Sequence, residues 1–138
     1  MYSKQAKEVL KKYGWYEGRK IDTTKQLAML EEFGFEVFDK VKEFISEFDG
    51  LQLPAKNFAN DFDKNNTNNF HYFDISHYIK CMYDLPVDKW EGYKKSLTTH
   101  IKSTEKVFPI GGLNGWYLTL YITESGKIID VRIIYVIL

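Results

Sequence analysis

The stretch VFPIGGLNGWYLTLYITESGKIIDVRIIYVI, residues 107–137, decides the fold class of this chain. Its three apolar runs are rich in β-branched and aromatic residues, which favour strands. The runs span residues 107–110, 116–123 and 128–137. Glycine-containing segments separate them, so the pattern predicts an antiparallel meander. Gly111 and Gly112 lack the following Lys-Ser/Thr of a phosphate-binding loop, and we expect them to form a hairpin turn.

Upstream of this stretch most apolar residues recur at the i, i+3, i+4, i+7 spacing of amphipathic helices. The predicted helices carry apolar faces over residues 6–13, 27–33, 37–48, 75–82 and 90–101. We expect brief strands at 51–53, ended by Pro54, and at 70–73, with an exposed loop in the Asn- and Asp-rich segment 57–69. Helices packed on an antiparallel sheet make an α+β fold, and we expect residues 1–138 to form one domain.

The bulk composition restricts the function classes. The chain has 138 residues, long enough for a core without disulfides, and its 19 Lys plus Arg balance 19 Asp plus Glu. This balance gives no support to nucleic-acid binding, and no stretch approaches the roughly 20 apolar residues of a membrane span. Cys81 is the only cysteine, and the N-terminus lacks the apolar core of a signal peptide. We therefore expect a cytoplasmic protein whose partner is neither nucleic acid nor membrane.

No motif predicts catalysis or a cofactor. The chain contains neither G-x-S-x-G nor a phosphate-binding loop. His77 and Cys81 have the i, i+4 spacing of two zinc ligands, but further ligands at a recognisable spacing are missing. Residues 61–65 open like a calcium loop, yet Asn66 and Tyr72 stand where that loop needs Gly and Glu. We expect no enzyme activity, no cofactor and no metal.

The distribution of charge is more informative than its sum. Segment 31–63 contains nine acidic residues and three lysines. At about 100° per residue, four of the acidic residues share one face of the helix predicted at 37–48. Together with two acidic residues of the loop, they are our candidate partner-binding residues. The six are Glu36, Asp39, Glu43, Glu47, Asp61 and Asp63. The face is either an ordinary solvated helix surface or a docking surface for a basic partner.

Two parts of the chain resemble a known family. The segments GWYEGRKID (14–22), GFEVF (34–38) and VKEFISEFDGL (41–51) resemble the opening of the third SUKH immunity-protein family, in which G-W-x-x-x-R precedes a helix ending like FL-x-x-F-G-G-L. FPIG (108–111) and TESGKI (123–128) are similar to that family's PIG and Gly-Lys hairpin. The residues that match the motifs are Gly14, Trp15, Arg19, Phe44, Phe48, Gly50, Pro109 and Gly111.

We expect these matching residues to be structural. The simplest interpretation is that Trp15 anchors the core and that Arg19 binds a carboxylate or helix-end carbonyls. We favour these roles over direct contacts of the two residues with a toxin, the partner that the family resemblance implies.

The chain departs from the family pattern at two places. Asp49 stands where the family more often has Gly, a small change because Asp tolerates turn conformations. The family usually continues into an acidic-apolar terminal helix, whereas this chain ends at Leu138, so we expect it to be truncated or divergent there. A final strand without this cover favours a homodimer through that strand or an unstable sheet edge.

The resemblance implies a protein of a polymorphic toxin system that binds and neutralises a cognate bacterial toxin without catalysis. The alternative is a non-enzymatic regulatory or ligand-binding domain of the same fold. Gene position discriminates between them, because an immunity gene is expected directly downstream of a large toxin gene.

Overall fold

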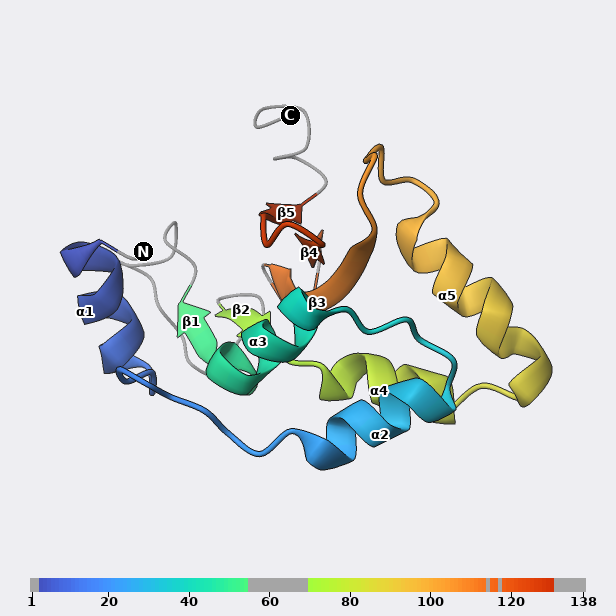
Figure 1. Cartoon of the computed structure of the whole chain (residues 1–138), viewed down its shortest axis with the longest axis horizontal. Helices are drawn as coiled ribbons and strands as arrows, with labels where there is room; N and C mark the ends of the chain where they lie inside the picture. The colour runs from blue at the N-terminus through green and yellow to red at the C-terminus, as the bar shows by residue number, and fades with distance from the viewer. Residues whose placement is uncertain (1–2, 55–69, 114, 117, 131–138) are drawn as a thin grey trace.

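The structure is a computed structural model that describes residues 3–54, 70–113, 115–116 and 118–130 (Figure 1). The helices are α1 (Lys4–Lys12), α2 (Thr24–Glu32), α3 (Asp39–Phe48), α4 (Ser76–Tyr83), the 3-10 helix η3 (Val87–Lys89) and α5 (Trp90–Thr98). The strands are β1 (Gln52–Pro54), β2 (Phe70–Phe73), β3 (Val107–Leu113), β4 (Leu118–Thr123) and β5 (Ile128–Asp130). The loop predicted at 57–69 and the last strand beyond Asp130 lie outside the described residues.

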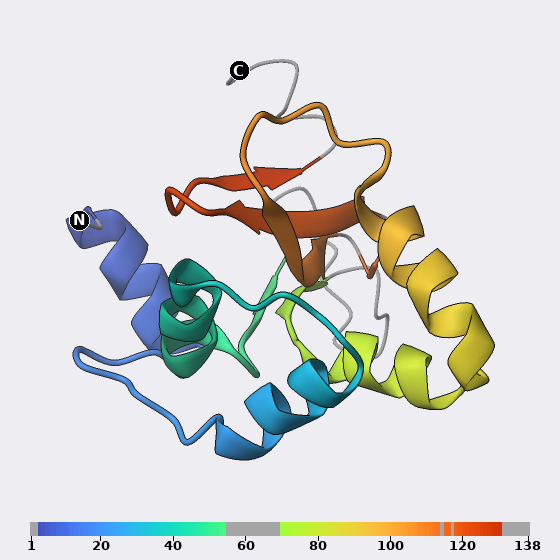
Figure 2. The same cartoon turned by 45° about the vertical axis from the view of Figure 1, so that its right-hand side comes forward.

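The five strands form one sheet in the order β1-β2-β3-β4-β5, and each neighbouring pair is antiparallel. The short pair β1–β2 joins the C-terminal meander through β2, which pairs with β3. Helix α3 packs on β3 and β4, while α1 and α5 lie at opposite ends of the molecule in both views (Figures 1 and 2). The α+β fold with helices on an antiparallel sheet is confirmed.

Short polar side chains begin two of the helices. The Ser3 hydroxyl accepts a hydrogen bond from the Ala6 amide at 3.1 Å, which satisfies one of the unpaired donors at the start of α1. The Asp74 carboxylate accepts a hydrogen bond from the Ser76 amide at 3.0 Å and thereby satisfies a donor at the start of α4.

The sequence prediction of a hairpin turn at Gly111 and Gly112 is wrong. Both residues lie inside β3, where they pair with Phe73 and Tyr72 of β2. A Cβ atom at Gly111 would lie 2.0 Å from the carbonyl oxygen of Tyr72, and one at Gly112 would lie 2.3 Å from the ring of Trp116. Glycine occurs in strands at bends and also where another backbone or ring approaches closely. Gly111 and Gly112 are cases of close approach, by β2 and by the Trp116 ring.

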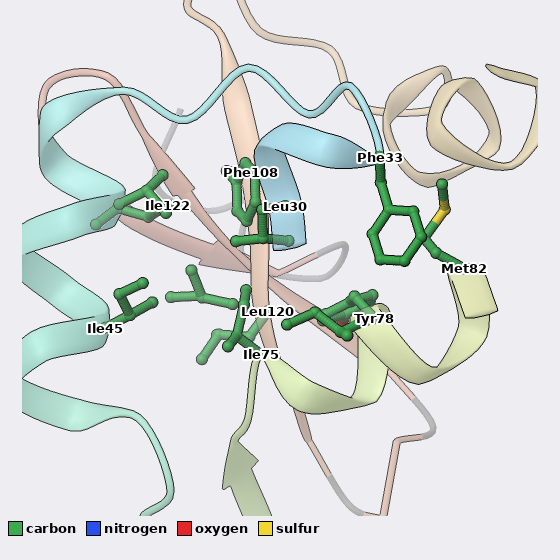
Figure 3. Packing of buried hydrophobic residues seen from close by; sticks show 12 residues of the cluster. Leu30, Phe33, Ile45, Ile75, Tyr78, Met82, Phe108, Leu120 and Ile122 are labelled. Carbon is green, nitrogen blue, oxygen red and sulfur yellow. The ribbon is translucent and has the colours of Figure 1, made fainter. Parts of the chain in front are cut away.

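The main core lies between the helices and the sheet (Figure 3). Its fully or nearly fully buried members come from α2, α3, the α4 segment, β3 and β4. They are Leu30, Phe33, Val41, Ile45, Ile75, Tyr78, Ile79, Met82, Phe108, Ile110, Leu120 and Ile122. A second cluster joins Trp15, Phe48 and Leu51 near α1, and a third joins Tyr121 to Ile129. Phe44 and Phe73 pack against both the first and the second cluster, which links the two.

Candidate functional site

Trp15 and Arg19 hold the C-terminal end of α3. The Trp15 side chain is 3% exposed, and its indole Nε1 donates to the Glu47 carboxylate at 2.8 Å. The Arg19 guanidinium donates to the main-chain carbonyls of Glu47 and, at 2.9 Å, Asp49. The last carbonyls of a helix have no partner within the helix, so these bonds satisfy acceptors that α3 leaves open. The segment preceding α2 thereby orients the end of α3 and its Glu47 side chain.

Asp49 is a buried carboxylate at the junction of α3 with the sheet. It is 6% exposed, and its Oδ1 accepts a hydrogen bond from the Ile75 amide at 2.7 Å. Burial raises the pKa of this carboxyl from 3.8 to about 6, although the Ile75 bond and the charge of Arg19 act in the opposite direction. The backbone of Asp49 is extended, and Gly50 takes the left-handed conformation with φ +88°. Asp49 therefore acts through its side chain, which connects α3 to the start of α4.

The structure engages three of the four predicted acidic residues around α3 in internal contacts. Glu36 precedes the helix and pairs with Lys106, and Glu43 pairs with Lys40 at 3.2 Å. Glu47 is half-buried and accepts a hydrogen bond from Trp15, whereas Asp39 is exposed. The face is thus less acidic than the sequence pattern alone indicates, because cations on the helix and on the sheet side partly neutralise it. Asp61 and Asp63 lie outside the described residues.

An open groove of about 430 Å³ lies between α3, the β4–β5 hairpin and the end of α1. In Figure 2 the hairpin stands above α3 with α1 beside it. The lining of the groove combines apolar side chains with charged and small residues. They are Leu10, Lys40, Glu43, Phe44, Glu47, Phe48, Phe73, Ile122, Ser125, Gly126 and Ile128. The groove therefore presents apolar and charged side chains together, and protein interfaces also contain both kinds.

Other residues of the family motifs lie in or beside packed elements. Gly14 follows α1 with φ +107°, and a Cβ atom there would lie 3.3 Å from the Leu51 side chain. Phe44 and Phe48 pack ring to ring on α3 with centroids 4.8 Å apart. Pro109 is buried in β3 at a register shift between Pro109 and Gly111, a place where a sheet tolerates a residue without an amide hydrogen.

His77 and Cys81 lie on one face of α4, with Nε2 and Sγ 3.9 Å apart. The His77 ring stacks on Trp116 with centroids 3.9 Å apart, and burial lowers the pKa of this imidazole. Within the described ranges no three His, Cys, Asp or Glu side chains are grouped to hold a metal ion. Of the helices that the structure describes, none has the length and apolarity to cross a membrane.

Sequence reasoning missed two elements of this region. It treated Asp49 only as a turn residue, because its donor Ile75 is 26 residues away and leaves no local signal. It also did not connect Leu10 and Ile128 with the acidic helix face, since these residues meet only where α1 and the hairpin approach α3.

Comparison with known proteins identifies one family. The model described as SUKH-3 immunity protein matches residues 2–132, which is most of the chain. Neither the curated proteins nor the solved structures gave a significant match.

Proposed function

The chain belongs to the SUKH-3 immunity protein family, and on this basis we propose that it binds a cognate bacterial toxin and blocks its activity. The observation that carries the proposal is the family match over residues 2–132. The protein acts in the cytoplasm as a stoichiometric inhibitor, and residues 1–138 act as one domain. Its effect is set by affinity and not by turnover.

The acidic face around α3 is the partner surface that we propose for this function. A toxin that attacks nucleic acids needs a basic surface around its active site, so an inhibitor with local negative charge is steered toward that surface. Asp39 and the Glu43 side chain, which is 66% exposed, are the members best placed to meet a partner. The exposed pair between Glu43 and Lys40 is weak and exchanges readily for a new partner.

The direct test uses the toxin encoded by the gene immediately upstream. Co-expression of the chain should restore growth to cells that produce the toxin domain, and an unrelated toxin should remain lethal. The purified pair should form a stable complex, and light scattering should give its stoichiometry. Light scattering of the chain alone tests the expected homodimer. Absence of both protection and binding would reject the proposed function.

A second test concerns the surface. Asp39→Lys with Glu43→Lys should lower the association rate and flatten its dependence on salt, because steering by these charges is removed. Glu47 is left unchanged, since its bond to Trp15 would mix stability with binding. The matched control is Glu31→Lys with Glu32→Lys on α2, which alters the net charge equally. Equal rates and equal salt slopes for both double variants would make the face an ordinary solvated surface.

A further inference from the structure

Trp116 lies in the connection between β3 and β4 with its backbone in the left-handed region, at φ +73°. Of the residues that the structure describes, it is the one non-glycine residue with a positive φ. A bulky side chain rarely adopts this conformation, so contacts elsewhere in the fold must hold it. The preceding Gly115 amide donates to the carbonyl of Phe70 on β2 at 2.9 Å. The closed form of this turn is therefore strained and depends on its neighbours.

Aromatic rings from two other elements contact the Trp116 indole. The His77 ring of α4 stacks on it with centroids 3.9 Å apart, and the Tyr72 ring of β2 is parallel to it at 5.6 Å. The Tyr78 ring meets the indole edge-on at 5.9 Å. Such ring pairs attract each other beyond the effect of burial. Of the three rings, His77 is the closest, and it is the one whose charge changes near neutral pH.

The surroundings of His77 suit a neutral imidazole. Its Nε2 lies 3.9 Å from the sulfur of Cys81, which is only a weak hydrogen-bond partner. The negative charge of Asp74 favours the imidazolium, but its Oδ1 already accepts two bonds from Ser76. Burial acts against the charged form more strongly and lowers the pKa of His77. The titratable groups of the described residues around this ring and its neighbours are Asp74, Tyr78, Cys81, Tyr72 of β2 and Tyr93 of α5.

We propose that His77 and Trp116 form a pH-sensitive latch on the β3–β4 turn. The neutral imidazole stacks on the indole and holds the turn closed, while protonation releases the indole and breaks the bond from Gly115 to Phe70. In the open turn the imidazole is hydrated and has its ordinary pKa of about 6.5, whereas the closed stack resists protonation. The open form therefore binds more protons, so the closed form is most stable above about pH 6.5 and loses stability as the pH falls below it.

The test uses the whole chain and follows NMR signals between about pH 5 and pH 8, the range in which histidine titrates. The Cε1 proton of His77 reports the pKa of the ring. Hydrogen exchange of the Gly115 amide, corrected for the intrinsic rate at each pH, reports opening of the turn. His77→Phe keeps a ring that can stack and removes the titration. The matched control His100→Phe makes the same change at an exposed histidine.

The pKa of His77 should lie below 6.5, and the protection of Gly115 should fall about fivefold or more from pH 8 to pH 5 in the wild type and in His100→Phe. In His77→Phe the protection should change by less than about twofold. A pKa of His77 above 6.5, which attraction of a cation to the indole face would produce, would overturn the inference. Wild-type protection that does not change with pH would do the same, and neither measurement requires a variant to fold. Equal pH dependence in the wild type and in His77→Phe would assign the opening to another group.

Discussion

The Nη2 atom of Arg19 lies 2.9 Å from the main-chain carbonyl oxygen of Asp49, thirty residues further along the chain. The same guanidinium also donates to the carbonyl of Glu47. One side chain thus bonds two acceptors at the end of α3, which requires the forked geometry of arginine. The contact connects the segment before α2 to α3, the helix that carries Glu43 and Glu47.

Arg19→Lys should lower the free energy of unfolding by about 1 to 2 kcal/mol, because one ammonium group does not reproduce both bonds at once. Urea denaturation followed by circular dichroism measures the change. The neighbouring exposed Lys20→Ala is the control and should stay within about 0.5 kcal/mol of the wild type. If Arg19→Lys is as stable as the control, the two carbonyl bonds contribute nothing measurable.

Trp15→Ala should lower the free energy of unfolding by about 3 kcal/mol, because it empties a buried aromatic site beside Phe48 and Leu51. Trp15→Phe keeps most of the packing and loses the bond to Glu47, so we expect about 1 kcal/mol. The exposed Tyr16→Ala serves as the aromatic control. A loss for Trp15→Ala as small as that for Tyr16→Ala would contradict the burial of the indole.

Asp49 should make stability depend on pH. Its pKa is raised from 3.8 to about 6 in the folded state, so its carboxyl favours folding below about pH 4, and this contribution is lost as the pH rises through about 6. The shift corresponds to about 3 kcal/mol. Asp49→Asn removes the titration while its Oδ1 still accepts from Ile75, and it should be more stable than the wild type at pH 7.5 but not at pH 4.

The measurement is the unfolding free energy of both proteins at several pH values between 4 and 7.5. The difference between them isolates Asp49, because other groups, including the half-buried His77 with its lowered pKa, are common to both. The exposed Asp39→Asn is the control for removing a carboxylate from the same region. A constant difference over this pH range would show that Asp49 titrates as an ordinary carboxyl.

Gly111→Ala should destabilise the protein by about 3 kcal/mol or more, because its Cβ would overlap the carbonyl oxygen of Tyr72 and push β2 away from β3. Gly92→Ala is the matched control. It lies in α5 with nothing within 4 Å of the added Cβ, and it should stabilise by about 0.5 to 1 kcal/mol. Thermal melting of both variants distinguishes these signs. A tolerated Gly111→Ala would argue against the close β2–β3 approach.

Thermal and urea unfolding should each show one cooperative transition with coincident far-UV and tryptophan signals. Phe44 and Phe73 pack against both larger core clusters, so loss of one cluster exposes part of the other. Separate transitions for the two signals would show that the segment around Trp15 unfolds independently of the sheet, and would oppose the proposal of one domain.

Much of the framework could be predicted because it depends on local order in the chain. The apolar spacing of Val41, Ile45 and Phe48 indicated the buried face of α3, and these three residues are buried in the structure. The strand-forming runs around Phe108 and Ile122 likewise indicated the meander. The prediction for Gly111 and Gly112 was wrong, because glycine is common both in turns and in strands that are closely approached, and the sequence does not distinguish the two.

The candidate site was predictable only in part. The positions of Glu43 and Glu47 on one helix face follow from the helical period. The ion pair of Glu43 with Lys40 depends on side-chain rotamers, and the bond of Glu47 to Trp15 depends on how the segment after α1 packs against α3. The acidic pattern therefore overstated the net charge that a partner meets.

The sequence by itself determined the types of the elements, the α+β class and the family, because helical and strand periods and motif spacings are properties of neighbours along the chain. Only the tertiary structure decided that Arg19 binds Asp49, that Asp49 binds Ile75, and that Ile128 meets α3 across a groove. Such contacts join residues separated by tens of positions, and they form only where the packing of helices on the sheet brings their backbones together.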